Sequence, residues 1–109
     1  MSTLLRSTLA ALLFAASALS ATAKEVVIDV RTPQEFASGH IAGAINIDHA
    51  LIGQEIGKAK VSKDDTVILY CRSGRRSELA LETLRKMGYS KAQNYGGIDE
   101  AAKRLQKKP

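Results

Sequence analysis

The only cysteine of the chain, Cys71, lies in a stretch that combines a nucleophile with positive charge. The stretch reads Cys71-Arg72-Ser73-Gly74-Arg75-Arg76-Ser77. An apolar segment that ends at Tyr70 leads into it, and a helical pattern follows behind it. A thiol becomes a good nucleophile as a thiolate, and helix N-termini and nearby arginines favour that form. We therefore predict that Cys71 is a reactive nucleophile in a loop that also binds an anionic substrate.

The alternative interpretation is that Cys71 is a small buried hydrophobic residue, as isolated cysteines commonly are. Three arginines within five residues are a poor lining for an apolar site, which favours the reactive interpretation. Without a second cysteine, Cys71 is either a free thiol or part of an intermolecular disulfide, and a two-cysteine redox motif is excluded. Because no cluster of carboxylates and histidines has the spacing of metal ligands, we expect neither a metal nor another cofactor.

The first 23 residues have the pattern of a secretory signal peptide. Arg6 supplies a positive n-region, residues 9–19 form an apolar core, and Ala21-Thr22-Ala23 is a small-residue cleavage site. The uncharged run 7–23 has 17 residues, fewer than the roughly 20 that a membrane span requires. We predict cleavage after Ala23, export to a bacterial periplasm or an equivalent compartment, and no stable membrane association afterwards. The alternative is an uncleaved anchor.

Residues 24–109 are predicted to form one domain, and their charge bears on possible partners. The formal net charge of the whole chain is +5, a modest excess that suits a small anionic ligand. The basic residues form no single stripe and are not interleaved with aromatic residues, so we predict that no nucleic acid is bound. No apolar stripe is evident, which favours a monomer.

The hydrophobic pattern predicts strands that alternate with helices. Strands are predicted at 25–30, 44–47, 66–70 and 92–95, and helices from Thr32 to Gly39, within 48–58, at 77–87 and from Ile98 onward. Thr32, Pro33 and Glu35 form a strong helix start, with a capping box and proline at the first position. This order predicts an α/β domain in which helices flank a mostly parallel sheet of four to five strands. Ligands bind outside the carboxyl ends of such strands, where Cys71 lies.

Three segments in this order resemble the single-domain rhodaneses, the thiosulfate sulfurtransferase family. They are Ile28-Asp29-Val30-Arg31-Thr32-Pro33-Gln34-Glu35-Phe36, then Gly39-His40-Ile41-Ala42-Gly43-Ala44-Ile45-Asn46-Ile47, and then Tyr70-Cys71 through Gly74 and Arg76, followed by Met87-Gly88-Tyr89 and Gly96-Gly97. The resemblance covers nearly all of residues 24–109. With the export signal, the chain most resembles the small periplasmic, phage-shock-type rhodaneses. The tryptophan that many members carry after the glycine pair is absent, so Ile98 and Leu105 are expected to provide that packing.

The resemblance implies a sulfur-transfer cycle without a cofactor. Cys71 would attack the outer sulfur of thiosulfate, expel sulfite and hold a persulfide, and then pass the sulfur to cyanide or a thiol acceptor. The backbone amides from Arg72 to Ser77, including those of Ser73 and Gly74, would surround the persulfide. The side chains of Arg72, Arg75 and Arg76 are candidates to bind the sulfonate end of the donor.

Other charged residues in these motifs are expected to support the structure. We interpret Asp29, Arg31 and Glu35 as an ion-pair or hydrogen-bond brace, and His40 as a structural histidine rather than a general base. His49 is predicted to be exposed on a helix.

Two other functions remain as alternatives. The first is a non-enzymatic persulfide carrier or sensing module that passes sulfur from Cys71 to one partner. The second is a phosphatase or arsenate reductase. Related enzymes with those activities have a longer loop, with the arginine one position further from the cysteine. Here Arg76 stands five positions after Cys71, so the loop favours sulfur over phosphate.

Overall fold

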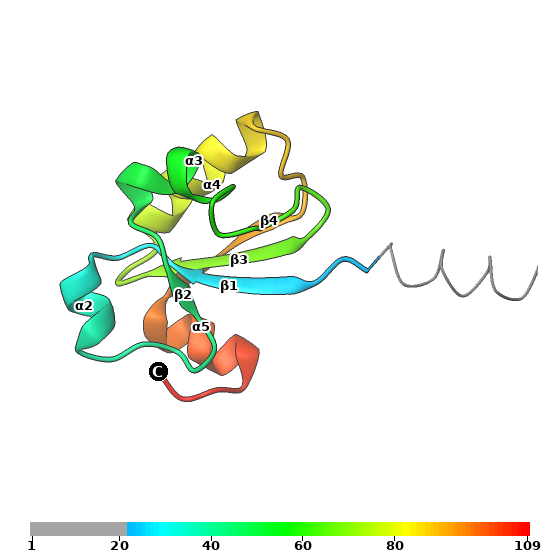
Figure 1. The fold of residues 1–109 in the computed structure, drawn as a ribbon. Helices are drawn as coiled ribbons and strands as arrows, with labels where there is room; N and C mark the ends of the chain where they lie inside the picture. The colour runs from blue at the N-terminus through cyan, green and yellow to red at the C-terminus, as the bar shows by residue number, and fades with distance from the viewer. Residues whose placement is uncertain (1–21) are drawn as a thin grey trace, which may run out of the picture.

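The computed structural model describes residues 22–109 as an α/β domain built on a parallel sheet (Figure 1). Its strands are β1 (Glu25–Asp29), β2 (Ile45–Asn46), β3 (Thr66–Cys71) and β4 (Ala92–Gly97). Within the described residues the sheet has four strands in the order β2-β1-β3-β4, and every neighbouring pair is parallel. The predicted fold class is therefore confirmed. Residues 1–21, which hold most of the predicted signal peptide, lie outside the described residues.

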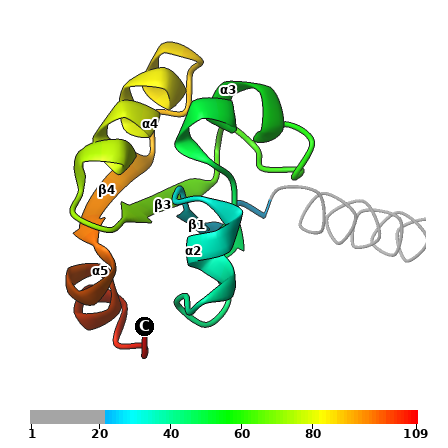
Figure 2. The same cartoon turned by 90° about the vertical axis from the view of Figure 1, so that its left-hand side faces the viewer.

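Helices cover both faces of this sheet, as the two views show (Figures 1 and 2). They are α2 (Pro33–Ala37), the 3₁₀ helix η1 (His49–Leu51), α3 (Ile52–Glu55), α4 (Arg75–Lys86) and α5 (Ile98–Leu105). Side chains of β3 alternate between two cores, because successive residues of a strand point to opposite faces. Leu69 and Cys71 join the core under α3 and α4, and Tyr70 joins the core under α2 and α5. Cys71 thus faces α4.

The helix after β1 begins as the sequence predicts. The side chain of Thr32 accepts a hydrogen bond from the Glu35 backbone N–H, and the Glu35 side chain accepts one from the Thr32 backbone N–H. Pro33 occupies the first helical position. The segment 48–58, predicted as one helix, instead forms η1 and the short α3. Gly53 and Gly57 lower the helix propensity of this segment, which accounts for the short elements.

The boundary between β3 and α4 is tighter than predicted. Cys71 is the last residue of β3 rather than the first of a loop, and α4 begins at Arg75 rather than near Ser77. Gly74 is the N-cap of α4, with φ +96°, a left-handed conformation that glycine adopts without a steric cost. Three residues therefore connect the cysteine to the helix, which holds its sulfur close to the helix N-terminus.

The second core is completed by the C-terminal helix. Ile98 and Leu105 of α5 pack against the cluster that contains Ala101, Ala102 and Tyr70, as expected from the absence of tryptophan. None of the helices in residues 22–109 is both long enough and apolar enough to cross a membrane.

Candidate active site

The sulfur of Cys71 is buried where β3 meets α4. The residue is 1% exposed, and its Sγ accepts a hydrogen bond from the Gly74 backbone N–H at 2.9 Å. The Ser77 hydroxyl lies 3.4 Å from Sγ. Burial raises the pKa of the thiol, but the Ser77 hydroxyl and the backbone N–H groups of Ser77, Ser73 and Gly74 lower it by more, so the net shift of the pKa is downward. The geometry favours a thiolate, as a nucleophile requires.

The polar contacts of Sγ in residues 22–109 come from the backbone and a hydroxyl rather than from arginine. Arg72 and Arg75 are exposed, and neither takes part in an ion pair within the described part of the chain. Their guanidinium groups are therefore available to an anion that approaches the cysteine from solvent. From the sequence, the arginines were expected to help stabilise the thiolate. In the structure, backbone amides do so instead.

Arg76 has a partner that the sequence interpretation did not assign to it. Its Nη1 and Nη2 donate to the two carboxylate oxygens of Glu35 at 2.7 and 3.0 Å. The hydrogen bonds from Arg76 are the main reason that the pKa of Glu35 is lowered to about 2, and the backbone hydrogen bond from Thr32 contributes next. This bidentate pair joins the N-terminus of α2 to that of α4. It leaves Arg76 less free than Arg72 or Arg75 to bind a donor.

Asn94 of β4 is a part of the site that the sequence analysis missed. Its Oδ1 accepts hydrogen bonds from the Ser77 hydroxyl at 2.7 Å and from the Gly96 backbone N–H at 2.8 Å. Its Nδ2 donates to the Gly74 carbonyl at 3.1 Å and to Glu78 at 3.0 Å. Four hydrogen bonds thus orient the amide and hold both the N-cap residue and the hydroxyl that faces Sγ.

The glycine pair at the end of β4 brings that strand close to the cysteine loop. A Cβ atom added at Gly97 would lie 2.6 Å from the Arg72 carbonyl oxygen and 3.5 Å from the Ser73 Cα. Gly97 also pairs with Cys71 in the sheet. A residue without a side chain is needed here because the backbone of the loop fills the space.

Replacing Gly97 with alanine is therefore expected to displace the loop. Overpacking of this kind typically lowers the free energy of unfolding by about 1–3 kcal/mol. We expect the rate of sulfur transfer to fall by more than this loss of stability alone would cause, because the Gly74 amide moves with the loop. Gly57→Ala is the matched control, because nothing lies within 4 Å of its added Cβ. Equal transfer rates in the two variants would contradict the steric argument.

The predicted supporting residues form contacts within the fold. Arg31 binds both carboxylate oxygens of the buried Asp29, with Nη2–Oδ2 at 2.7 Å, and donates to the Gly39 carbonyl at 2.7 Å. The Nδ1–H of His40 donates to the Phe36 carbonyl at 2.8 Å, and the two rings stack 3.6 Å apart. His49, predicted to be exposed on a helix, is half-buried in η1.

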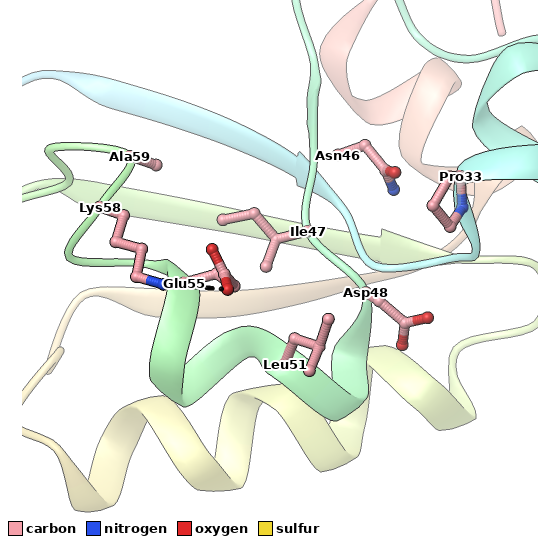
Figure 3. Close-up of a pocket in the computed structure, with 8 residues that line it drawn as sticks. All are labelled: Pro33, Asn46, Ile47, Asp48, Leu51, Glu55, Lys58 and Ala59. Atoms are coloured by element: carbon pink, nitrogen blue, oxygen red, sulfur yellow. Dashed lines mark hydrogen bonds and ion pairs between the residues drawn. The ribbon is translucent and has the colours of Figure 1, made fainter.

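A hollow of about 400 Å³ is lined by residues from the start of α2, from β2 and from α3, and Cys71 does not line it. Figure 3 shows Pro33 and Asn46 at one end of it and the ion pair of Glu55 and Lys58 at the other. The Cys71 sulfur instead contacts the loop backbone at Gly74, so this hollow is not the candidate site. Among residues 22–109, no three His, Cys, Asp or Glu side chains are placed to hold a metal ion.

Comparison with known proteins identifies the family. The model of the rhodanese-like domain matches residues 15–104, most of the chain. The chain belongs to the rhodanese-like family. Its fold, with Cys71 at the carboxyl end of the central strand β3, is a rhodanese-like fold.

Several curated relatives of this rhodanese-like chain are named sulfurtransferases. It is 42% identical over 80 residues to the thiosulfate sulfurtransferase PspE of Escherichia coli (strain K12), covering 73% of this chain and 77% of the relative. It is 40% identical over 81 residues to a sulfurtransferase of Allochromatium vinosum, covering 73% and 74%. Among solved structures, a rhodanese with anions from E. coli superposes with a TM-score of 0.67 at 42% identity, covering 70% of this chain and 89% of that one. These relatives support a rhodanese-type sulfurtransferase activity for the chain.

Proposed function

We propose that this protein is a thiosulfate sulfurtransferase that carries the transferred sulfur as a persulfide on Cys71. The observation that carries the proposal is the position of Sγ, which accepts the Gly74 N–H at 2.9 Å at the N-terminus of α4. A sulfur in this position is stabilised as a thiolate before the reaction and as a persulfide anion after it. The name of the E. coli relative supports thiosulfate as the donor.

The reaction has two displacement steps. In the first, the Cys71 thiolate attacks the outer sulfur of thiosulfate, a new S–S bond forms, and sulfite leaves with the electron pair of the broken bond. In the second, cyanide or a thiolate attacks the outer sulfur of the persulfide, and Cys71 leaves again as a thiolate. The first step uses the lowered pKa of Cys71, and neither step consumes an external oxidant or reductant.

The loop supplies the positive electrostatic environment that both steps need. The N-terminus of α4 has backbone N–H groups without helical partners at Arg75, Arg76 and Ser77, and such groups stabilise negative charge. We assign these N–H groups to bind the outer sulfur of the persulfide. The description of the E. coli structure as a rhodanese with anions supports anion binding by a protein of this fold.

We assign Arg72 and Arg75 to bind the sulfonate end of thiosulfate, because Arg76 is already paired with Glu35. Replacing either arginine with alanine is expected to raise the KM for thiosulfate roughly tenfold and to change kcat less, since a hydrogen bond to a charged group contributes about 1.5–3 kcal/mol. The steady-state rates at varied thiosulfate measure this. Arg85→Ala, an exposed arginine in the last turn of α4, is the control with the same loss of charge. A KM in the loop variants equal to that of the control would show that these arginines do not bind the donor.

We also propose that the reaction takes place in the periplasm after residues 1–23 are removed. The signal-peptide pattern of the sequence supports this location. The described residues next to the cut, Thr22 and Ala23, are exposed and belong to no helix or strand.

The test of the proposed function is the mass of the protein after incubation with thiosulfate and no acceptor. We expect a gain of one sulfur atom, which cyanide then removes as thiocyanate. If Cys71 is verified to be a reduced thiol and the protein still gains no sulfur, thiosulfate is not the donor. A persulfide that forms but passes only to one protein partner, and not to cyanide, would favour the carrier function instead.

A further inference from the structure

The buried carboxylate of Asp65 lies beside the backbone nitrogen of Lys24, where the predicted signal peptide ends. Asp65 is 2% exposed and stands directly before β3. Its Oδ1 accepts a hydrogen bond from the Lys24 backbone N–H at 3.0 Å, and its Oδ2 accepts one from the Ser62 backbone N–H at 2.8 Å. Sulfur transfer on Cys71 uses none of these groups. Burial of a carboxylate costs free energy unless hydrogen bonds compensate it, and the Lys24 N–H supplies one of these hydrogen bonds.

Lys24 has a defined position next to this carboxylate. Its carbonyl oxygen accepts a hydrogen bond from the Thr66 backbone N–H at 2.9 Å, which belongs to the first pair of β1 with β3, Glu25 with Thr66. Its side-chain Nζ donates to the Lys60 carbonyl at 3.3 Å. The chain nitrogen of residue 24 is thus held against Asp65.

The predicted cleavage falls at this nitrogen. Small residues at Ala21 and Ala23 are the pattern after which signal peptidases cut. Hydrolysis of the bond between Ala23 and Lys24 consumes one water, leaves a carboxylate on Ala23, and turns the amide nitrogen of Lys24 into a free amino group. That group takes up a proton from solvent and becomes an α-ammonium.

We propose that Asp65 is the binding site for this α-ammonium group, so that removal of the leader converts a hydrogen bond from an uncharged amide into an ion pair at the start of β1. In the uncut chain the Lys24 nitrogen is an uncharged amide with one N–H. After cleavage it carries a full positive charge at the same place, so that donor and acceptor are both ionised and Coulomb attraction adds to the hydrogen bond. The uncut chain therefore lacks an interaction that ties β1 to the turn before β3 in the mature protein.

The charges around Asp65 keep its carboxyl ionised, so the α-ammonium of Lys24 is the group of this pair that titrates near neutral pH. The backbone hydrogen bond from Lys24 and that from the turn hold the pKa of the Asp65 carboxyl below its ordinary value, and the positive side chains of Lys24 and Lys91 act in the same direction. Lys63 and Asp64 on the turn itself are exposed. Asp65 is thus ionised wherever an α-amino group titrates. Because the ion pair raises the α-amino pKa, the added stability is present below about pH 8 and is lost as the pH rises through the raised value.

The test begins with the full-length chain, expressed in a host that exports it. The intact mass of the exported protein is expected to start at Lys24. The pH dependence of reductive methylation then gives the α-amino pKa, which we expect roughly one unit above the ordinary 7.7–8.0, so that labelling at pH 8 is about fivefold slower. Asp65→Asn should restore the ordinary pKa, and Asp64→Asn, an exposed neighbour with the same change of charge, should not.

A second variant keeps the inference testable if Asp65→Asn does not fold. One glycine inserted between Ala23 and Lys24 moves the α-ammonium one residue away from Asp65 after cleavage. We expect its Tm to be lower than that of the wild type by roughly 4 °C at pH 6, with the difference disappearing near pH 10. A start other than Lys24, an ordinary α-amino pKa in the wild type, or equal Tm values at pH 6 would overturn the inference. None of these measurements depends on sulfur transfer.

Discussion

Replacing Cys71 with serine is expected to abolish sulfur uptake from thiosulfate while leaving the fold intact. A serine hydroxyl is not ionised near neutral pH and forms no bond equivalent to a persulfide, so we expect transfer to fall by at least about 10³-fold. The mass spectrum after thiosulfate treatment should show no added sulfur in the variant and one added sulfur in the wild type.

The surroundings of Cys71 explain why the variant should remain folded. The Gly74 N–H and the Ser77 hydroxyl that contact Sγ are equally suited to a serine oxygen, so the new hydroxyl is not left without hydrogen-bond partners. We expect the free energy of unfolding to change by no more than about 1 kcal/mol. Retained transfer in a variant with wild-type stability would show that Cys71 is not the nucleophile. Loss of the fold together with the activity would instead point to a structural role.

Features encoded by neighbouring residues were predicted correctly from the sequence. The capping box that joins Thr32 to Glu35 is complete within four residues, and the structure contains it. The strand that ends at the cysteine and the alternation of strands with helices follow from hydrophobic patterns of similar length. The start of α4 was predicted two residues late, because Gly74 caps it through its backbone conformation and offers no capping side chain. The usual start signal of Ser, Thr, Asp or Asn is absent at that position.

The parts of the site that were not predicted depend on residues far apart in the chain. The pair of Arg76 with Glu35 spans 41 positions, and the contact of Asn94 with Ser77 spans 17. Neither spacing corresponds to a helix or strand period, so these contacts arise only once β1, β3 and β4 lie side by side. Gly97 lies beyond the strand predicted at 92–95, and its close approach to the Arg72 carbonyl likewise follows from the sheet.

Lengthening the loop by one glycine between Gly74 and Arg75 is expected to have the second large effect on sulfur transfer. The three residues between Cys71 and α4 place the Gly74 N–H 2.9 Å from Sγ and allow Gly74 to cap the helix. An inserted residue separates the capping position from the residue that contacts the sulfur. It also breaks the link by which Asn94 holds the Gly74 carbonyl and the Ser77 hydroxyl together.

We expect this insertion to lower kcat/KM for thiosulfate by roughly 10²-fold, because displacements of about 1 Å at a reacting centre have effects of that size. The pKa of Cys71, measured by the pH dependence of its alkylation, should rise toward the ordinary value of about 8.5, since the amides that lower it are displaced. A glycine inserted next to Gly57, in the exposed segment after α3, is the matched control and should leave both quantities unchanged. If the loop insertion left the alkylation pKa and the turnover unchanged, the short loop would not be what activates the thiol.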